Sequence, residues 1–108
     1  MVTKEELAQL DLQYRAIANQ RLMMEQRLAE LKLAQDYLNE HKKDKVYKMV
    51  GPVLVELDYE EAKKEIEEEI KTAERGIEIS KKKEEELKKK LETLVNEYLK
   101  GQQGGGGA

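Results

Sequence analysis

The sequence has no cysteine, tryptophan or phenylalanine, and it has one proline and one histidine. Without cysteine, the chain has no disulfide framework, no thiolate nucleophile and no thiolate metal site. The small number of aromatic residues argues against a thick globular core. No apolar run approaches the ~18 residues of a membrane-spanning helix, and the first residues carry acidic groups without an apolar signal segment. We therefore expect a soluble, cytoplasmic protein.

An excess of one charge is also missing, because 20 Lys and Arg residues stand against 23 Asp and Glu residues. Since a basic excess would be needed to attract a phosphate backbone, we do not expect nucleic acid as a partner. The chain is instead rich in Glu, Lys and Leu, with 40% charged and 39% hydrophobic residues. With regular apolar spacing, this composition is typical of long helices and coiled coils. At 108 residues, it predicts a single domain.

A spacing of three and four residues repeats along the first part of the chain, from Leu7 to Leu38. It places the side chains on one seam of a helix, as in a coiled coil. Thr3 followed by Glu6 forms a capping box, so we predict a first coiled-coil helix over residues 3–42. The first seam consists of Leu7, Leu10, Tyr14, Ile17, Arg21, Met24, Leu28, Leu31, Gln35 and Leu38.

A second seam with the same spacing runs from Ile66 to Tyr98. Gly101 stands where a glycine ends a helix, which predicts a second coiled-coil helix over residues 58–100 and a flexible glycine-rich tail over 101–108. The second seam consists of Ile66, Ile70, Ala73, Ile77, Ser80, Glu84, Leu87, Leu91, Leu94 and Tyr98. Two helices of similar length around a short connector can lie antiparallel and bury both seams. We therefore predict a mainly α-helical fold, an antiparallel two-helix coiled coil.

Polar residues interrupt both seams, and two of them carry opposite charges, Arg21 and Glu84. In an antiparallel pair that turns near residues 50–54, these two side chains fall within about one helical turn of each other. They can form an ion pair that fixes the register of the two helices. Alternatively, both long side chains can extend into water. The sequence leaves these two arrangements open.

Catalytic patterns are scarce in this sequence. His41 is the only histidine, and there is no glycine-rich phosphate loop and no metal-ligand spacing. The runs of Glu and Lys place opposite charges four residues apart, which is typical of a solvated helix surface. A thin two-helix coil also offers no cleft that would desolvate paired carboxylates. We predict no enzyme, no cofactor and no metal site.

The stretch "VYKMVGPVLVEL", residues 46–57, differs from the rest of the chain. Its β-branched and aliphatic residues flank a Gly-Pro pair, which predicts a β-hairpin over residues 45–57 between the two helices. Apolar residues occupy both faces, and an isolated two-stranded ribbon is marginal in water. We expect hairpins from several chains to close into a β-barrel platform, or the ribbon to cap its own coil. The predicted oligomerisation residues are Val46, Tyr47, Met49, Val50, Gly51, Pro52, Val53, Leu54, Val55 and Leu57.

The same stretch resembles the hairpin motif of the prefoldins, specifically of their β-class subunits. Val46-Tyr47-Lys48, Gly51 and Val53-Leu54-Val55 stand in the order usual for that motif. A single hairpin between two coil helices is similar to the β class, because α-class subunits have two hairpins. The resemblance covers roughly residues 3–100 in architecture. Only the hairpin is specific in sequence.

The resemblance implies a hexamer of two α-class and four β-class chains, with coils that extend from a double β-barrel. It also implies a chaperone that binds unfolded polypeptide clients without ATP and delivers them to a group II chaperonin. Family members contact clients at the free ends of the coils, where helix fraying makes seam residues available. The corresponding client-binding residues here are Val2, Leu7, Leu10, Leu94, Val95, Tyr98 and Leu99. In a second interpretation, most of these residues only close the coil.

Two functions therefore remain after the sequence alone. The first is an ATP-independent holdase subunit with the client-binding residues at the coil ends. The second is a structural coiled-coil adaptor or filament-forming scaffold, in which the hairpin builds the assembly and the helices bind one folded partner. The two functions differ in the number of unrelated unfolded proteins that the chain would protect from aggregation.

Overall fold

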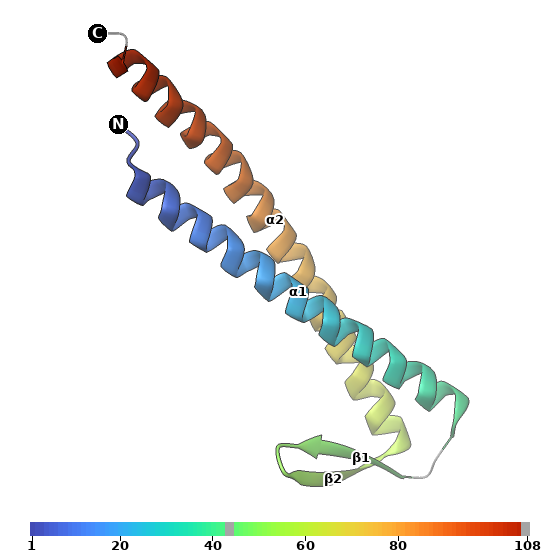
Figure 1. The fold of residues 1–108 in the computed structure, drawn as a ribbon. Coiled ribbons are helices and arrows are strands. Elements are labelled where there is room, and N and C mark those ends of the chain that lie inside the picture. The colour runs from blue at the N-terminus through green and yellow to red at the C-terminus, as the bar shows by residue number, and fades with distance from the viewer. Residues whose placement is uncertain (43–44, 107–108) are drawn as a thin grey trace. The chain divides into compact units, whose positions relative to one another are not determined.

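The computed structural model describes residues 1–42 and 45–106. In this range the chain forms a long helix α1 (Lys4–Glu40), a β-hairpin of β1 (Lys45–Val50) and β2 (Val53–Asp58), and a long helix α2 (Tyr59–Gly106) (Figure 1). The predicted fold class, two long helices with one hairpin between them, is confirmed. Within the described part of the chain, no helix has a segment that is both long enough and apolar enough to cross a membrane.

The chain divides into two compact units. Unit 1 consists of Met1–Met23 and Ile77–Ala108, and unit 2 consists of Met24–Gly76. The first part of α1 and the last part of α2 belong to unit 1, together with both chain ends. The rest of the two helices and the whole hairpin belong to unit 2.

Unit 1 pairs the two helices along the predicted seams. The backbone N–H of Glu6 donates to Thr3 Oγ1 at 3.1 Å, so the first half of the capping box forms at the start of α1. No seam residue of this unit is fully exposed. Partly or fully buried are Leu7, Leu10, Tyr14, Ile17 and Arg21 from α1, with Ile77, Ser80, Glu84, Leu87, Leu91, Leu94 and Tyr98 from α2. A period read from sequence alone thus identifies the packed face of both helices.

The polar pair in the seam of unit 1 forms an ion pair. Arg21 Nε donates to Glu84 Oε2 at 2.5 Å, and Glu84 is only 8% exposed. Of the two arrangements that the sequence left open, the structure has the ion pair. A charge pair in such a place adds little net stability, but it is costly to separate, so it fixes the register of α1 against α2.

Unit 2 has a small core where α1 ends and α2 begins. Leu38, Tyr59 and Ala62 are buried, and Val46, Leu57 and Ile66 pack against them. The Tyr59 hydroxyl donates a hydrogen bond to the backbone carbonyl oxygen of Leu38. Carbonyls in the last turn of a helix have no partner within the helix. This bond therefore satisfies an end group of α1 from the first residue of α2.

Farther along unit 2, the helices approach each other closely at Gly76. A Cβ atom added to Gly76 would lie 2.7 Å from the Sδ atom of Met24. Glycine in a helix interior costs about 1 kcal/mol relative to alanine. Its presence here is explained by the Met24 side chain that occupies the space.

The hairpin has a regular ladder and a short turn. Lys45 pairs with Asp58 and Val50 with Val53, which leaves Gly51 and Pro52 as a two-residue loop. Gly51 has a φ of 58°, a value that glycine adopts without strain. A positive φ at the first loop position, followed by the fixed negative φ of proline, is the pattern of a type II′ turn. This turn matches the twist of the two strands.

The end of α2 differs from the sequence expectation. The helix continues to Gly106, whereas Gly101 suggested an end at Lys100 and a flexible tail over 101–108. Gln102 Nε2 donates to the Tyr98 hydroxyl at 2.8 Å, one helical turn earlier, and this contact supports the extension. The last two residues of the expected tail, 107 and 108, lie outside the described range.

Candidate functional site

The hairpin presents two faces, because side chains alternate along a strand and cross-strand partners share a face. The first, which we call the Lys48 face, consists of Val46, Lys48, Val50, Val53, Val55 and Leu57. The second, the Met49 face, consists of Lys45, Tyr47, Met49, Leu54, Glu56 and Asp58. Both faces carry large apolar side chains, as expected from the sequence.

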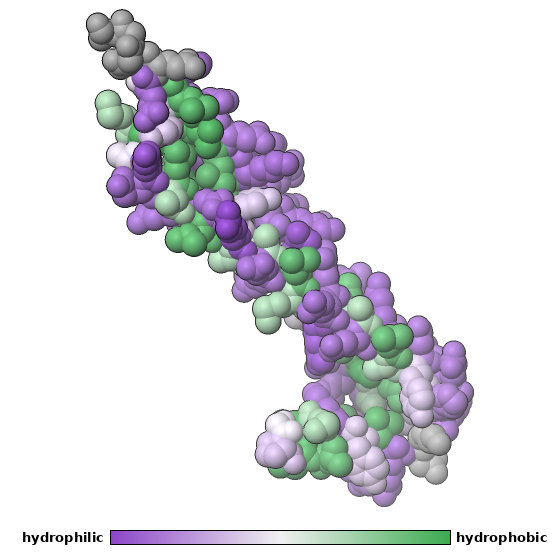
Figure 2. Space-filling model, in the orientation of Figure 1, coloured by the Kyte–Doolittle hydropathy of each residue, from purple (hydrophilic) through white to green (hydrophobic). Residues whose placement is uncertain are grey.

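Most of the predicted oligomerisation residues are exposed. Met49 is 73% exposed and Leu54 63%, and Tyr47, Val50, Val53 and Val55 are also exposed, as are both turn residues. Only Val46 and Leu57, a cross-strand pair, pack against the core of unit 2. Of the two arrangements expected for the ribbon, the structure shows the contact with its own coil at the base only, and the barrel stays a prediction. Its base covers the coil and its remaining apolar surface is open (Figure 2).

A network of ion pairs joins the hairpin to both helices of unit 2. Lys48 Nζ donates a hydrogen bond to Glu65 Oε1 and lies 3.8 Å from Glu69 Oε1. Arg27 Nη2, on α1, lies 3.4 Å from Glu69 Oε2. The hydrogen bond to Glu65, together with the negative charges of Glu65 and Glu69, raises the pKa of Lys48.

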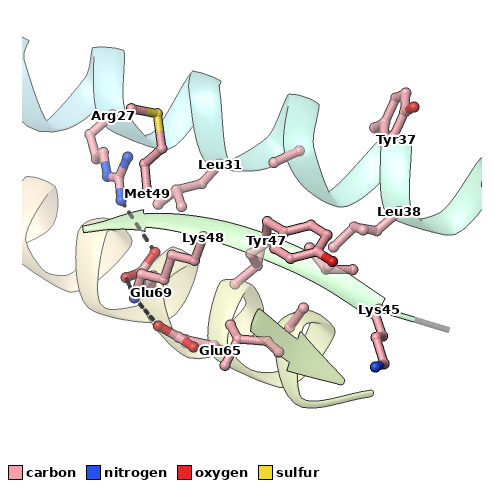
Figure 3. Close-up of a pocket in the computed structure, with 15 residues that line it drawn as sticks. Arg27, Leu31, Tyr37, Leu38, Lys45, Tyr47, Lys48, Met49, Glu65 and Glu69 are labelled. Atoms are coloured by element: carbon pink, nitrogen blue, oxygen red, sulfur yellow. Dashed lines mark hydrogen bonds and ion pairs between the residues drawn. The ribbon is translucent and has the colours of Figure 1, made fainter. Parts of the chain in front are cut away.

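A groove in unit 2 lies between β1 and residues of both helices (Figure 3). Its volume is about 640 Å³, and five consecutive residues of β1 line it, so it runs along one edge of this strand. At the Lys48 face it also reaches Leu57 of β2. The described sheet has two strands, which leaves this edge of β1 without a strand partner. The helical residues that line the groove are Arg27, Leu31, Ala34, Tyr37, Leu38, Ala62, Glu65, Ile66 and Glu69. A free strand edge beside an apolar groove can accept a further strand.

The predicted client-binding residues all lie in unit 1, at its ends. Val95 is 39% and Leu99 50% exposed, and both lie beside the α2 seam. The others are half-buried, namely Val2, Leu7, Leu10, Leu94 and Tyr98. Apolar side chains are visible along this part of the molecule in Figure 2. The structure brings these residues together in one unit, with a mixture of packed and accessible surface.

Sequence reasoning missed the Lys48 network and the groove. A signal for the network was present, because Glu65 and Glu69 stand four residues apart and therefore share one face of α2. Lys48 is also one of only two charged residues within 46–57. The sequence did not show in which direction the ribbon leaves the helices. For that reason it did not show which cation meets those two acids.

Residues considered for chemistry lie on the surface. His41 is exposed next to Tyr37, with ring centroids 4.5 Å apart. Among residues 1–42 and 45–106, no three His, Cys, Asp or Glu side chains are arranged to hold a metal ion.

Comparison with protein families settles what kind of chain carries this hairpin. A family model described as prefoldin subunit matches residues 3–105. The chain belongs to the prefoldin subunit family. The resemblance seen in the hairpin motif is thereby confirmed. A comparison with curated proteins finds no match.

Solved prefoldin structures show the same architecture. The prefoldin beta subunit from Thermococcus strain KS-1 is 28% identical, with a TM-score of 0.74 over 86% of this chain and 82% of that chain. The prefoldin beta2 subunit of the same strain is 27% identical, with a TM-score of 0.72 over 82% of this chain and 95% of that chain. With its single hairpin, this chain is a β-class prefoldin subunit. It is thus a chaperone subunit that assembles with other prefoldin subunits.

Proposed function

We propose that this prefoldin subunit is an ATP-independent holdase. It captures non-native polypeptides at the coiled-coil ends in unit 1 and delivers them to a group II chaperonin. It works in the cytoplasm, without catalysis and without a cofactor. The observation that carries the proposal is the partly open apolar surface at the ends of unit 1, which includes the exposed Val95 and Leu99.

The surface at these ends suits weak and unselective capture. Val95 and Leu99 widen the apolar strip beside the half-buried seam residues Leu94 and Tyr98. Helix ends open locally at low cost in free energy, so the seam side chains become available as well. Several such ends in one assembly raise the effective concentration of binding sites around one unfolded chain. Binding without sequence preference follows, because apolar contact is not directional.

The hairpin supplies the assembly in this proposal. Its exposed apolar residues on both faces, with Met49 at 73% and Leu54 at 63%, are covered when hairpins from several chains join into one closed sheet. We propose that the assembly is a hexamer of two α-class chains and four β-class chains, by analogy with the family. In that arrangement a chain of this class meets neighbours through the residues of the hairpin.

The decisive experiment measures capture and assembly together. The chain is purified alone and with an α-class prefoldin subunit, and the assembly mass is determined by light scattering. Each sample is then tested for suppression of aggregation of several unrelated denatured proteins, without nucleotide. Broad suppression by the hexamer is the expected result. Suppression of a single client, or of none, contradicts the holdase and supports the structural adaptor.

A truncation separates capture from assembly. Deleting residues 1–10 and 95–108 removes the end of unit 1 and leaves unit 2 intact in sequence. We expect the assembly mass to fall only by the mass of the deleted residues, with most of the aggregation suppression lost. If the truncated chain suppresses aggregation as well as the full chain, clients bind elsewhere than at the ends of the coil.

A further inference from the structure

The Lys48 face of the hairpin meets the rest of unit 2 at two successive steps along the ribbon. At the base, Val46 and Leu57 pack against the core formed by Leu38, Tyr59 and Ala62. One pair farther along, Lys48 is bound to Glu65 and approaches Glu69. The last pair, Val50 and Val53, is 53% and 57% exposed.

Two contact points have a different mechanical effect from one. Successive pairs on one face of a ribbon lie about 7 Å apart. The apolar contact at the base is not directional and by itself allows the ribbon to pivot. A charge-assisted hydrogen bond at the next pair adds a second point of attachment, which restricts that movement. Lys48 is therefore the second of the two points at which the ribbon is attached to the rest of unit 2.

The network reaches α1 as well as α2. The carboxylate of Glu69 lies near two cations, Lys48 on β1 and Arg27 on α1 (Figure 3). Arg27 therefore binds the same acid that Lys48 approaches. The other cation of β1 behaves differently, because Lys45 Nζ lies 3.3 Å from Glu56 Oε1 on β2. That pair stays within the hairpin. Lys48 instead links β1 to α2 directly and to α1 through Glu69 and Arg27.

We propose that the ion-pair network of Lys48, Glu65, Glu69 and Arg27 positions the hairpin for assembly. It fixes the direction in which the apolar tip and the free edge of β1 face a neighbouring subunit. The inference rests on the proposed assembly role of the hairpin and adds a structural control of that role. Lys48 acts through the orientation of the ribbon, so it is a positioning residue.

The orientation can be measured on the chain alone, before any assembly. Because the sequence has no cysteine, Leu54→Cys on the hairpin and Glu68→Cys on α2 provide two spin-label sites. Distances between the labels are recorded at a dilution at which the chain is monomeric. We expect a narrow distribution for the parent pair and a broad one after Lys48→Glu. We expect a narrow distribution again in the charge swap Lys48→Glu with Glu65→Lys. Circular dichroism of each variant checks that the helices remain.

Neutral substitutions at two lysines of β1 separate the effect of losing the Lys48 contact from the effect of losing one positive charge. Lys48→Gln is expected to broaden the distance distribution, whereas Lys45→Gln, which removes one positive charge from the same strand, leaves it narrow. In the unlabelled chain, Lys48→Gln is expected to raise the concentration needed for half-assembly with the partner subunit about fivefold, and Lys45→Gln less than twofold. At about 1 M salt, where the Debye length is about 3 Å, the parent distribution should also broaden.

Three outcomes overturn the proposal. The first is an unchanged distance distribution in Lys48→Glu, and the second is a charge swap that does not restore the narrow distribution. The third is a broadened distribution with unchanged half-assembly concentration. Failure of the proposed chaperone function gives a different result. In that case the wild-type chain has a narrow distance distribution and assembles normally, but it does not suppress aggregation.

Discussion

Unit 1 and unit 2 use the same residue types in opposite ways. In unit 1 the ion pair Arg21–Glu84 lies in the packed seam, and the apolar seam residues are at least half-buried. In unit 2 the ion pairs of Lys48 are half-exposed, and large apolar side chains of the hairpin stand in solvent. The apolar seam of unit 1 is thus covered within the unit, whereas the apolar tip of the hairpin in unit 2 stays open. The comparison predicts that assembly and register respond to different substitutions.

The largest expected effect is on assembly, from a charge on the hairpin. Leu54→Asp places a carboxylate on the Met49 face, and burying an unpaired charge in a subunit contact costs several kcal/mol. We expect complete loss of the oligomer by light scattering, with most of the helical circular dichroism signal retained. Glu56→Gln, two residues away, serves as the control and should leave the mass unchanged. An oligomer of unchanged mass in Leu54→Asp would refute the closed sheet.

The second effect concerns the register in unit 1. Arg21→Ala removes the Arg21 contact of Glu84, whose carboxylate lies in the packed seam. Because separating such a pair is costly, we expect the free energy of unfolding, measured in urea, to fall by about 3 kcal/mol. The double variant Arg21→Leu with Glu84→Leu should recover most of that loss, because an apolar pair avoids the cost of desolvating charge.

The matched control for the register is Arg15→Ala. Arg15 pairs with Asp11 at 2.9 Å on the surface of the same helix, and its side chain is 73% exposed. Such pairs contribute about 0–1 kcal/mol. Equal losses in Arg21→Ala and Arg15→Ala would show that the Arg21–Glu84 pair has no special role.

A smaller effect is expected at the ends of unit 1. Val95→Ser with Leu99→Ser removes exposed apolar surface beside the seam without touching a seam residue. We expect about a threefold weaker affinity for an unfolded client, consistent with the burial of about 25 Å² less apolar surface per client contact. Light scattering should give an unchanged assembly mass. A parallel variant, Ala8→Ser with Gln9→Ser on α1, should bind clients normally.

The smallest effect is expected at Gly76 in unit 2. Alanine gains about 1 kcal/mol of helix propensity, but its Cβ displaces the Met24 side chain. Because the end of a methionine side chain is flexible, the two terms nearly cancel, and the free energy of unfolding should change by less than about 1 kcal/mol. A larger loss in Gly76→Ala would show that the two helices of unit 2 pack more rigidly than the Met24 contact suggests.

Local periodicity explains how much of this fold could be predicted. The seam residues from Leu7 to Leu38 and from Ile66 to Tyr98 follow a repeat of three and four residues that is visible along each helix. The Gly-Pro pair located the turn. Counting residues on each side of that turn brought Arg21 close to Glu84. Each of these inferences depends only on spacing along the chain.

The features that were missed depend on direction in space. The contact of Lys48 with Glu65 requires the angle at which the ribbon leaves the helices, and no repeat in the sequence encodes that angle. The groove beside β1 is a consequence of the same angle. At the end of α2, the expectation failed because glycine was taken to stop the helix at position 101, whereas the Gln102–Tyr98 contact supports its continuation.

The hydrogen bond from Tyr59 to the Leu38 carbonyl has a practical consequence. It ties the end of α1 to the start of α2 directly, and the ladder places Lys45 opposite Asp58. The hairpin is therefore an insertion between two fixed points of the coil, and its first and last residues are neighbours. Such an insertion can be exchanged as a cassette. Grafting hairpins with other edge residues between the same two points would test whether the hairpin alone determines which subunits the coil assembles with.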